Sequence, residues 1–474
     1  MFVGRKKHLS DLSRLMRKKS ASLVTCRGRR RIGKSTLVRE FAKKAARFIE
    51  IEGLPPRKGI GNQHQLQAFS RQLSHQTDLP SLTLENWPQA MQLLASVIKN
   101  EWTVVLLDEI SWMGGYDPDF PGHLKTAWDT VFKKYPKLIL VLCGSVSSWI
   151  NDNILNNTGF VGRDSWDIIL EGLPLCECNL FWRSARKRID SSEKLDVLSV
   201  TGGVPKYLEE IDPGVTAEEN ILRLCFRKQG ILFREFEQIF SDVFGKRADN
   251  YREIVSTLAY GRKTVSEISN ALGKERSGHL SSYLQDLTLG GFIARDTVFK
   301  PQTGKNARTE KYRLCDNYSR FYLRYIAPNR ERIEKNLMLG MSLDQLPQWE
   351  TIMGLQFENL VLNNIHSLKT FMNIGNAPLL AAAPYFQKPT TRRKGCQIDL
   401  LMRTKNTLYA IEIKRRKSID ISVIEEMREK VRRLPPLRNL SVRMALIYAG
   451  WLDPGIEKED YFDFLIPFEQ LLER

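Results

Sequence analysis

Gly28 and Gly33 enclose four residues and are followed directly by Lys34 and Ser35, which gives the pattern G-x₄-G-K-S. An apolar stretch precedes this loop, and residues with helical spacing follow it. In that setting the glycines let backbone N–H groups face a phosphate, and the helix N-terminus adds its positive dipole end. Lys34 would reach the β- and γ-phosphates, and the Ser35 hydroxyl would ligate Mg²⁺. The spacing therefore predicts a site for a nucleoside triphosphate.

A second apolar run, residues 102–107, ends in two carboxylates, Asp108 and Glu109. A parallel strand buried on both faces reads as a continuous apolar run, and ligands of open α/β sheets gather at the carboxyl ends of the strands. We therefore expect Asp108 to hold Mg²⁺ indirectly, and Glu109 to polarise a water for attack on the γ-phosphate. The simpler alternative is a strand that ends in surface acids.

A third apolar run, residues 138–143, leads to Gly144 and Ser145, and Arg163 follows a polar loop further on. Ser145 would contact the γ-phosphate or hold the attacking water. Arg163 would neutralise charge on the phosphates. Surface serines and arginines are common, so a purely structural role for both stays open.

Residues 1–210 resemble the archaeal-type ATPases within the AAA+ and STAND group of P-loop NTPases. The pieces that carry the resemblance are Phe2-Val3-Gly4-Arg5, the loop 28–35, Leu106-Leu107-Asp108-Glu109, Cys143-Gly144-Ser145, Gly162-Arg163 and the segment 202–208. The resemblance implies an α/β P-loop fold with a parallel sheet, ATP rather than GTP, and Gly4 and Arg5 near the adenine. The ATP-binding residues that it implies in the loop are Gly28, Arg29, Arg30, Arg31, Ile32, Gly33, Lys34, Ser35 and Thr36.

The middle of the chain has the spacing of a winged helix. A helical pattern over 251–260 precedes Thr264 and Glu267, which form an N-terminal capping box, and a third helical pattern runs over 277–289 into a hairpin. The polar residues expected on the outer face of that third helix are His279, Ser281, Ser282 and Gln285. They are suited to contact bases or phosphates. A winged helix used only for packing or protein contacts is the alternative.

Asp399, Glu412 and Lys414 stand at a spacing that resembles the PD-(D/E)xK nuclease superfamily. Glu412 and Lys414 share one face of a strand, and Asp399 on the neighbouring strand can converge with Glu412 on Mg²⁺. Lys414 would then orient or activate a water. The resemblance implies a small restriction-endonuclease-like α/β domain, with Glu358 as its additional helical acid.

Arg415 and Arg416 follow the trio and would extend a phosphate-binding surface. A basic, half-exposed hairpin without catalytic function is the alternative. Domains of this kind attached to archaeal-type ATPases can also keep the fold for DNA binding or assembly without cutting.

The net charge of +18 points to a polyanionic partner, either nucleic acid or an anionic membrane surface. The surplus is 13 in residues 1–50 and 15 in residues 251–450. Part of the first block lies on the phosphate loop itself, so the second block favours DNA. No apolar run is long enough to cross a membrane, and no signal peptide opens the chain. Seven scattered cysteines are typical of a cytoplasmic protein with reduced thiols.

The sequence thus predicts four domains: a P-loop ATPase core (1–180), a helical lid (181–245), a winged helix (246–335) and a nuclease-like domain (336–474). The favoured function is an ATP-hydrolysing enzyme that acts on DNA. The alternative is an ATP/ADP signalling switch whose C-terminal domain serves binding or assembly without cleavage. Oligomers are possible in either case.

Overall fold

The computed structural model describes residues 2–57, 59–185, 188–273, 278–389, 391 and 394–473. The chain forms two compact units. The first consists of Met1–Glu171, Glu237–Tyr251 and Ser282–Gly291, and the second of Gly172–Phe236, Arg252–Ser281 and Phe292–Arg474. The chain therefore passes between the two units several times. The division into four domains stays a prediction.

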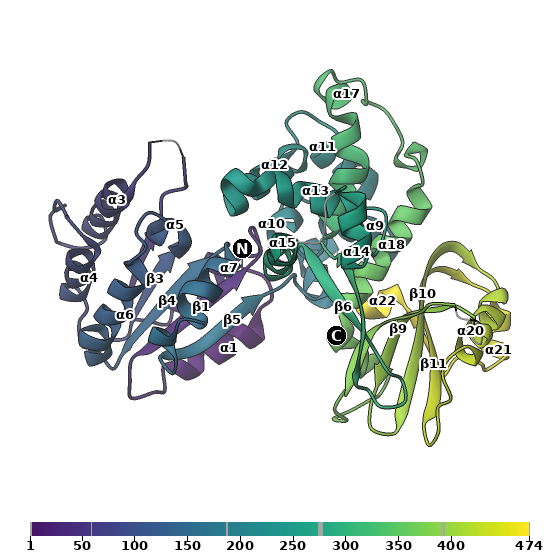
Figure 1. The fold of residues 1–474 in the computed structure, drawn as a ribbon. Coiled ribbons are helices and arrows are strands. Elements are labelled where there is room, and N and C mark those ends of the chain that lie inside the picture. Colours follow the sequence, from purple (N-terminus) through teal and green to yellow (C-terminus); the bar gives the residue numbers. More distant parts are fainter. Residues whose placement is uncertain are drawn as a thin grey trace. The chain divides into compact units, whose positions relative to one another are not determined.

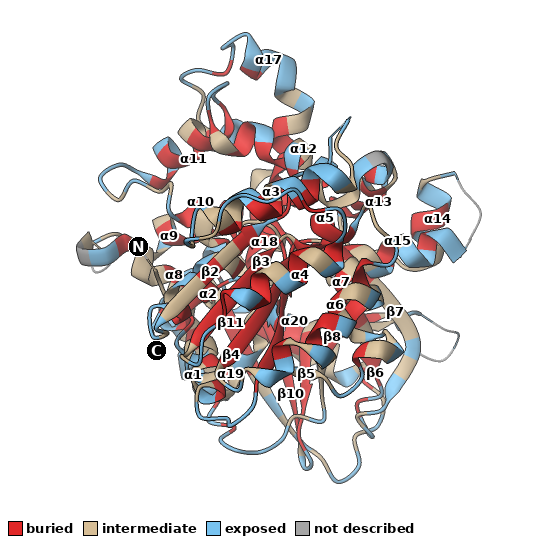
Figure 2. Ribbon diagram, turned by 90° about the vertical axis from the view of Figure 1, so that its left-hand side faces the viewer, coloured by how far each residue is buried: buried red, intermediate tan, exposed pale blue. Residues whose placement is uncertain are grey.

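A parallel five-stranded sheet forms the centre of the first unit, with strand order β2-β3-β4-β1-β5 (Figure 1). The strands are β1 (Ser22–Gly28), β2 (Arg47–Glu52), β3 (Thr103–Asp108), β4 (Leu138–Gly144) and β5 (Asp164–Leu170). Every residue of β1, β3 and β4 is buried, as continuous apolar runs require (Figure 2). The predicted α/β fold with a parallel sheet is confirmed.

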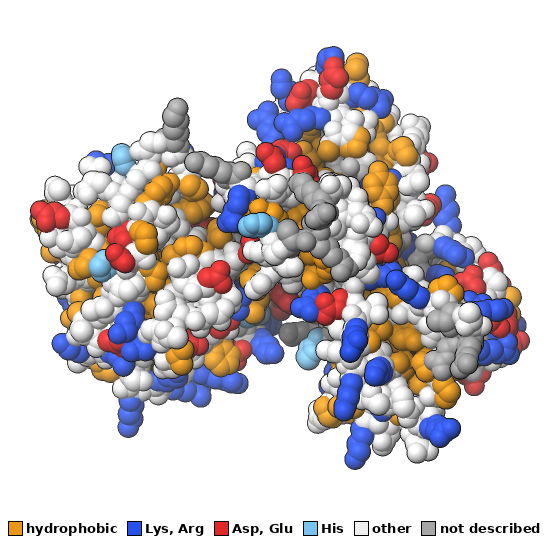
Figure 3. Space-filling view, in the orientation of Figure 1, with side chains coloured by type: hydrophobic (Ala, Val, Ile, Leu, Met, Phe, Trp, Pro, Cys, Tyr) orange, Lys and Arg blue, Asp and Glu red, His pale blue; other side chains and the backbone are white. Residues whose placement is uncertain are grey.

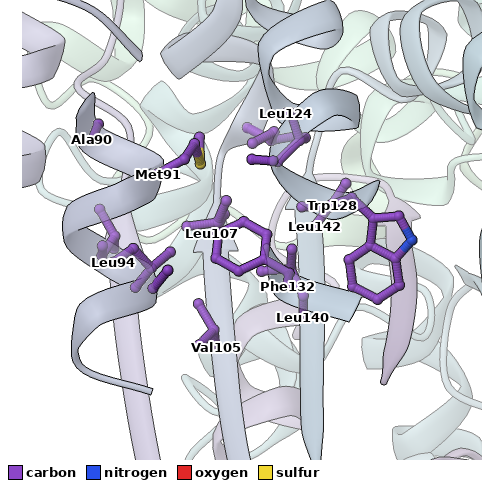
Figure 4. Packing of buried hydrophobic residues seen from close by; sticks show 14 of the residues in the cluster. Ala90, Met91, Leu94, Val105, Leu107, Leu124, Trp128, Phe132, Leu140 and Leu142 are labelled. Carbon is purple, nitrogen blue, oxygen red and sulfur yellow. The ribbon is translucent and has the colours of Figure 1, made fainter. Parts of the chain in front are cut away.

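Helices cover this sheet, and their apolar faces build its core. They are α1 (Lys6–Leu15), α2 (Lys34–Ala42), α3 (Asn62–Ser74), α4 (Trp87–Ser96), α5 (Ile110–Gly114), α6 (Phe120–Thr130) and α7 (Ser147–Ile150). Figure 4 shows Met91 and Leu94 of α4, and Leu124 and Trp128 of α6, packed over the side chains of β3 and β4. This packing fixes the strand ends from which the candidate residues project.

The middle of the chain is mostly helical. Its elements are α8 (Leu175–Cys178), α9 (Ser191–Thr201), α10 (Pro205–Leu208), α11 (Ala217–Cys225), α12 (Ile231–Phe244), α13 (Ala248–Leu258), α14 (Val265–Ala271), α15 (Gly278–Leu289), the antiparallel hairpin of β6 (Ile293–Phe299) and β7 (Asn306–Leu314), α16 (Asn317–Phe321) and α17 (Arg330–Glu334). The capping box predicted at Thr264 and Glu267 opens α14 and is confirmed. The predicted first residue of the third helix, Ser277, lies outside the described residues.

The C-terminal part of the second unit holds a mixed five-stranded sheet of order β12-β11-β10-β9-β8. Its strands are β8 (Ala381–Gln387), β9 (Cys396–Arg403), β10 (Thr407–Ile419), β11 (Ser441–Leu452) and β12 (Phe464–Pro467). Strand β9 is antiparallel to β8 and β10, whereas β10, β11 and β12 are parallel. The helices in this part are α18 (Trp349–Leu362), α19 (Ile365–Phe371), α20 (Ser422–Arg432), α21 (Pro454–Lys458) and α22 (Phe468–Leu471).

The described part of the chain holds no helix that combines the length and the apolar character needed to span a bilayer.

Candidate nucleotide site and carboxylate site

The phosphate loop joins β1 to α2, at the carboxyl edge of the first unit's sheet. Gly33 has a φ of 88° and Arg31 a φ of 69°, so the loop turns sharply before the helix begins at Lys34. The Lys34 side chain is 6% exposed, and its Nζ donates to the carbonyls of Gly28 (3.1 Å) and Arg29 (3.2 Å). The ammonium is therefore held inside the loop, where a phosphate would meet it.

Ser35 and Asp108 meet beside this loop. The Ser35 hydroxyl donates to Oδ2 of Asp108, while Oδ1 of Asp108 accepts the backbone N–H of Glu109 at 3.0 Å. A hydroxyl and a carboxylate oxygen are hard oxygen ligands, the type that Mg²⁺ prefers. The pair predicted from two distant segments is thus brought together, and its chemistry fits a Mg²⁺–nucleotide.

Glu109 and Ser145 form a second pair at the same edge. Glu109 has a φ of 47°, and its carboxylate accepts the Ser145 hydroxyl at 2.7 Å and the Ser145 backbone N–H at 3.1 Å. A non-glycine residue in the left-handed region is strained, which commonly marks a functional position. The two hydrogen bonds fix the carboxylate where β3 and β4 both end.

The Arg5 side chain contacts the phosphate loop by donating a hydrogen bond to a backbone carbonyl of the loop. Arg5 is buried, has a φ of 59° and follows Gly4, whose φ is 71°. Its Nη2 donates to the carbonyl of Glu171 at 2.6 Å and to that of Ile32 at 3.3 Å. Arg5 thereby ties the phosphate loop to the end of β5. Its predicted place near the adenine stays a prediction.

Asp242 at the end of α12 is a partner that sequence reasoning missed. It forms an ion pair of 2.5 Å with Arg30 of the phosphate loop, and the Arg30 guanidinium also lies 5.9 Å from the centre of the Trp112 ring. Arg29 lies near the end of α15, because a Cβ built on Gly291 would be 3.7 Å from its Cβ. No sequence motif includes Asp242. The only indication in the sequence is that an arginine of the loop is expected to have an acidic partner.

Two further residues predicted to bind ATP lie at the start of α2. Arg31 is half-buried in the loop before this helix, and Thr36 is exposed in its first turn.

Arg163 does not lie beside the phosphate loop. It precedes β5, whose first residue pairs with Leu23 of β1, so it lies at the amino edge of the sheet, opposite the phosphate loop. Asp129 engages its guanidinium at 2.8 Å and 2.9 Å, and this contact lowers the pKa of Asp129 to about 2. Arg163 therefore does not reach the phosphates of its own chain, which corrects the expected charge-neutralising role there.

The residues predicted for nucleic-acid contact on the third helix, His279, Ser281, Ser282 and Gln285, are all exposed on α15. The hairpin after that helix is not free. Val298 and Phe299 of β6 share a hydrophobic core with Ala383 and Tyr385 of β8. The wing of the predicted winged helix is thus packed against the C-terminal sheet.

Asp399, Glu412 and Lys414 come together on β9 and β10, as their spacing predicts. The Asp399 carboxylate accepts the backbone N–H of Ile413 at 2.9 Å, and Lys414 Nζ lies 2.8 Å from Glu412. Burial, followed by the nearby negative charges of Glu412 and Glu358, raises the pKa of Asp399 to about 8. Neighbouring carboxylates with little access to solvent are suited to share a cation.

Lys430 is the second residue that sequence reasoning missed. Its Nζ donates to both carboxylate oxygens of Glu412, at 2.6 Å and 2.7 Å, and Glu412 is only 2% exposed. The signal was present in the four-residue spacing of Glu426 and Lys430. Glu426 and Lys430 are one turn apart on α20, and Glu426 pairs with Lys414 at 3.0 Å. That face of α20 therefore lies over the carboxylates.

Glu358 of α18 is engaged by a cation of its own chain. Arg262 lies 2.6 Å from Glu358 and 3.2 Å from Asp296, and Arg313 lies 3.1 Å from Asp296. Among the described residues, no group of three or more His, Cys, Asp or Glu side chains is arranged to hold a metal ion. The structure thus brings Asp399 near both Glu412 and Glu358, and it pairs Glu358 with Arg262.

The two predicted phosphate-contacting arginines also differ. Arg415 is half-buried and pairs with Glu350 at 2.8 Å and with Asp196 at 2.9 Å. Two carboxylates of its own chain therefore neutralise its charge. Arg416 is exposed.

Arg262→Gln is expected to destabilise the fold by about 3 kcal/mol, because the change leaves Glu358, whose side chain is only 13% exposed, without its cation. Urea unfolding measures the loss. The double variant Arg262→Gln/Glu358→Gln removes both charges and should recover most of it, since Asp296 keeps Arg313. Equal stability of wild type and Arg262→Gln would contradict the network.

Three comparisons show which known proteins the chain is similar to. Residues 2–211 match the family described as "ATPase domain predominantly from Archaea". Over 394 residues the chain is 23% identical to an uncharacterized protein of Methanocaldococcus jannaschii, covering 79% of this chain and 81% of that protein.

Among solved structures, the chain is similar to a Walker-type ATPase of Pyrococcus abyssi, with a TM-score of 0.50, 19% identity and coverage of 68% of this chain and 96% of that one. The ORC2 protein of Aeropyrum pernix, solved in ADPNP–ADP complexes, has a TM-score of 0.41, 13% identity and coverage of 70% and 94%. The parallel sheet is shared with the P-loop ATPase fold of the first of these. Residues 2–211 of this chain form an archaeal-type ATPase domain.

Proposed function

We propose that the chain binds and hydrolyses ATP at the carboxyl edge of the first unit's sheet. The observation that carries this proposal is the meeting of Ser35 with Asp108 and of Ser145 with Glu109, next to the Lys34 ammonium. Lys34 binds the β- and γ-phosphates. Glu109 orients a water and accepts its proton at the carboxylate, and Ser145 positions Glu109.

Ser35 and Asp108 would hold the Mg²⁺ that accompanies ATP. When bound, the ion neutralises charge on the β- and γ-phosphates. The loop backbone and the N-terminus of α2 supply further positive potential to the same anion. Arg30 shares its charge with Asp242, which lowers the positive potential that this arginine offers to the phosphates.

We further propose that the hydrolysis of ATP serves work on DNA. The support is the exposed polar face of α15 together with the surplus of 15 positive charges in residues 251–450. These charges bind phosphates without regard to sequence, whereas polar side chains on a helix can contact bases. Binding should therefore weaken steeply as salt rises.

In the C-terminal sheet we propose a Mg²⁺-dependent nuclease site. Asp399 and Glu412 would hold the ion, which when bound polarises a phosphodiester. Lys414 lies within hydrogen-bonding distance of Glu412 and can orient a water, and Lys430 contacts the same carboxylate from α20.

One observation favours a second function. Glu412 is bracketed by two lysines and Glu358 is held by Arg262, so the cations of this chain already neutralise these acids. Such a sheet can serve binding or assembly without cleavage. The chain would then be an ATP/ADP signalling switch.

Incubation with supercoiled and linear DNA, with Mg²⁺ or Mn²⁺ and with or without ATP, separates the two functions. We expect nicking that Asp399→Ala abolishes and that Lys34→Ala preserves, because the two sites use different residues. Asp344→Ala, which removes an exposed acid, is the control. ATP-dependent oligomerisation with no cleavage by the wild type would instead establish the switch.

A further inference from the structure

Positive charge gathers at the amino edge of the first unit's sheet, opposite the phosphate loop. In a parallel sheet the segments that lead into the strands share one edge, and here the segments 16–21, 43–46, 97–102 and 131–137 lead into β1, β2, β3 and β4. They contain nine basic side chains and one acid, Glu101. This amino-edge row consists of Arg17, Lys18, Lys19, Lys43, Lys44, Lys99, Lys133, Lys134 and Lys137.

Little of this charge is neutralised within the chain. Lys43 pairs with Glu40 at 2.6 Å, and Lys133 lies 3.7 Å from Asp129. Within the described residues, the other seven members of the row have no carboxylate within 4 Å. All nine are exposed except Lys137, which is half-buried and donates to the carbonyl of Asn100. In Figure 3, blue side chains gather along the lower margin of the unit that holds this sheet.

The nucleotide cannot be the partner of these charges. Strand β1 runs from the amino edge at Ser22 to the loop at Gly28, and seven residues of strand span about 20 Å. Counter-charges on a triphosphate at the loop lie more than a Debye length away at physiological salt, so the two are screened from each other. We therefore expect the amino-edge row to bind an anion other than the nucleotide.

The shape of the row fits an extended polyanion. Strands β2, β3, β4 and β1 are neighbours in the sheet, and at a spacing of about 4.8 Å their leading segments cover about 14 Å. A DNA duplex presents about eight phosphate charges over that length of its axis. A row of this density matches a continuous phosphate backbone better than a single small anion.

An anionic membrane surface fits less well. An interfacial anchor needs an apolar face beside its charges. Within the described residues, the segments that hold the row expose no large hydrophobic side chain, and Leu12 and Leu15 of α1 point into the core. The exposed Val161, Trp166 and Ile169 lie just before or along β5, an edge strand that contributes none of the row's charges. The row offers charge without apolar area.

We propose that the amino-edge row binds the phosphate backbone of duplex DNA. The row shares no residue with the α15 face or with the carboxylates of the C-terminal sheet. It supplies affinity without sequence preference, because lysines contact phosphates rather than base edges. The proposal requires neither ATP hydrolysis nor cleavage by this chain.

The test is the full-length variant Lys18→Gln/Lys19→Gln/Lys44→Gln/Lys134→Gln, titrated with a fluorescent duplex of about 30 base pairs at several salt concentrations. We expect affinity at least about tenfold lower than wild type, and a slope of log K against log salt that is smaller by about 3.6, because each of the four phosphate contacts contributes about 0.9. ATP affinity should equal that of wild type, which also shows that the variant is folded.

A control variant of equal charge, Arg227→Gln/Lys228→Gln/Lys335→Gln/Lys458→Gln, removes exposed cations elsewhere. An equal loss in this control would overturn the proposal in favour of net charge. Undiminished DNA affinity in the row variant would overturn it while leaving the α15 proposal intact. Absence of DNA binding by wild type would overturn both. Vesicles of phosphatidylserine that sediment with wild type alone, without DNA affinity, would assign the row to a membrane.

Discussion

Glu109→Gln is expected to keep ATP affinity near the wild-type value and to lower the rate of hydrolysis by about 10²–10⁴-fold. The amide keeps the shape of the side chain, and its oxygen can still accept the Ser145 hydroxyl that fixes the carboxylate in the wild type. It cannot accept a proton from water. The loss therefore falls on turnover rather than on binding.

Steady-state phosphate release and a separate nucleotide titration measure the two quantities. Ser145→Ala serves as the companion variant, because it removes the hydroxyl that holds Glu109 while leaving the carboxylate in place. We expect a smaller loss of turnover from this change. Glu101→Gln, at the opposite edge of the sheet, is the control for charge. A normal hydrolysis rate in Glu109→Gln would contradict the role of this residue.

Lys34→Ala is expected to weaken ATP binding by about 100-fold or more. A hydrogen bond to a charged group contributes about 1.5–3 kcal/mol, and in the proposed site the ammonium would contact two phosphates. The variant also leaves the carbonyls of Gly28 and Arg29 without their buried donor, so the loop loses the group that shapes it.

Isothermal titration with ATP and with a non-hydrolysable analogue measures this loss. Lys43→Ala removes an exposed lysine just beyond the end of the same helix and should bind ATP like the wild type. Undiminished affinity in Lys34→Ala would refute the nucleotide site, whatever the outcome at Glu109.

The elements that position the nucleotide site were predictable because their signals are local. The apolar run before Asp108 indicates a strand buried on both faces. Asp108 is the last residue of that strand, and its carboxylate accepts the hydroxyl of Ser35. The same holds for Asp399 and Glu412, since alternation along the two paired strands of a hairpin determines which side chains share a face. In each case a few residues of sequence determine the geometry.

The partners of these residues were not predictable, because they come from distant segments. Asp242 and Arg30 are more than two hundred residues apart in the sequence, and Arg262 and Glu358 are 96 residues apart. Any of several acids could have taken either place. Tertiary packing alone decides which one is near.

The placement of Arg163 shows a different limit. A sequence shows that an arginine lies beside a strand but does not by itself show at which edge of the sheet it lies. Arg163 comes immediately before its strand, and in a parallel sheet that position lies opposite the phosphate loop. Strand direction had to be combined with the motif before a role could be assigned.

The packing of the β6–β7 hairpin on β8 has a consequence for inheritance. Arg403 donates to the carbonyl of Pro301 at 3.2 Å and Gln302 to that of Arg438 at 2.7 Å, so the hairpin tip is bonded to the carboxylate-bearing sheet. A gene cut between residues 335 and 336 would separate Val298 and Phe299 from the apolar side chains of the C-terminal sheet that bury them. Recombination that shuffles whole domains is therefore expected to keep these two segments together, or to lose both.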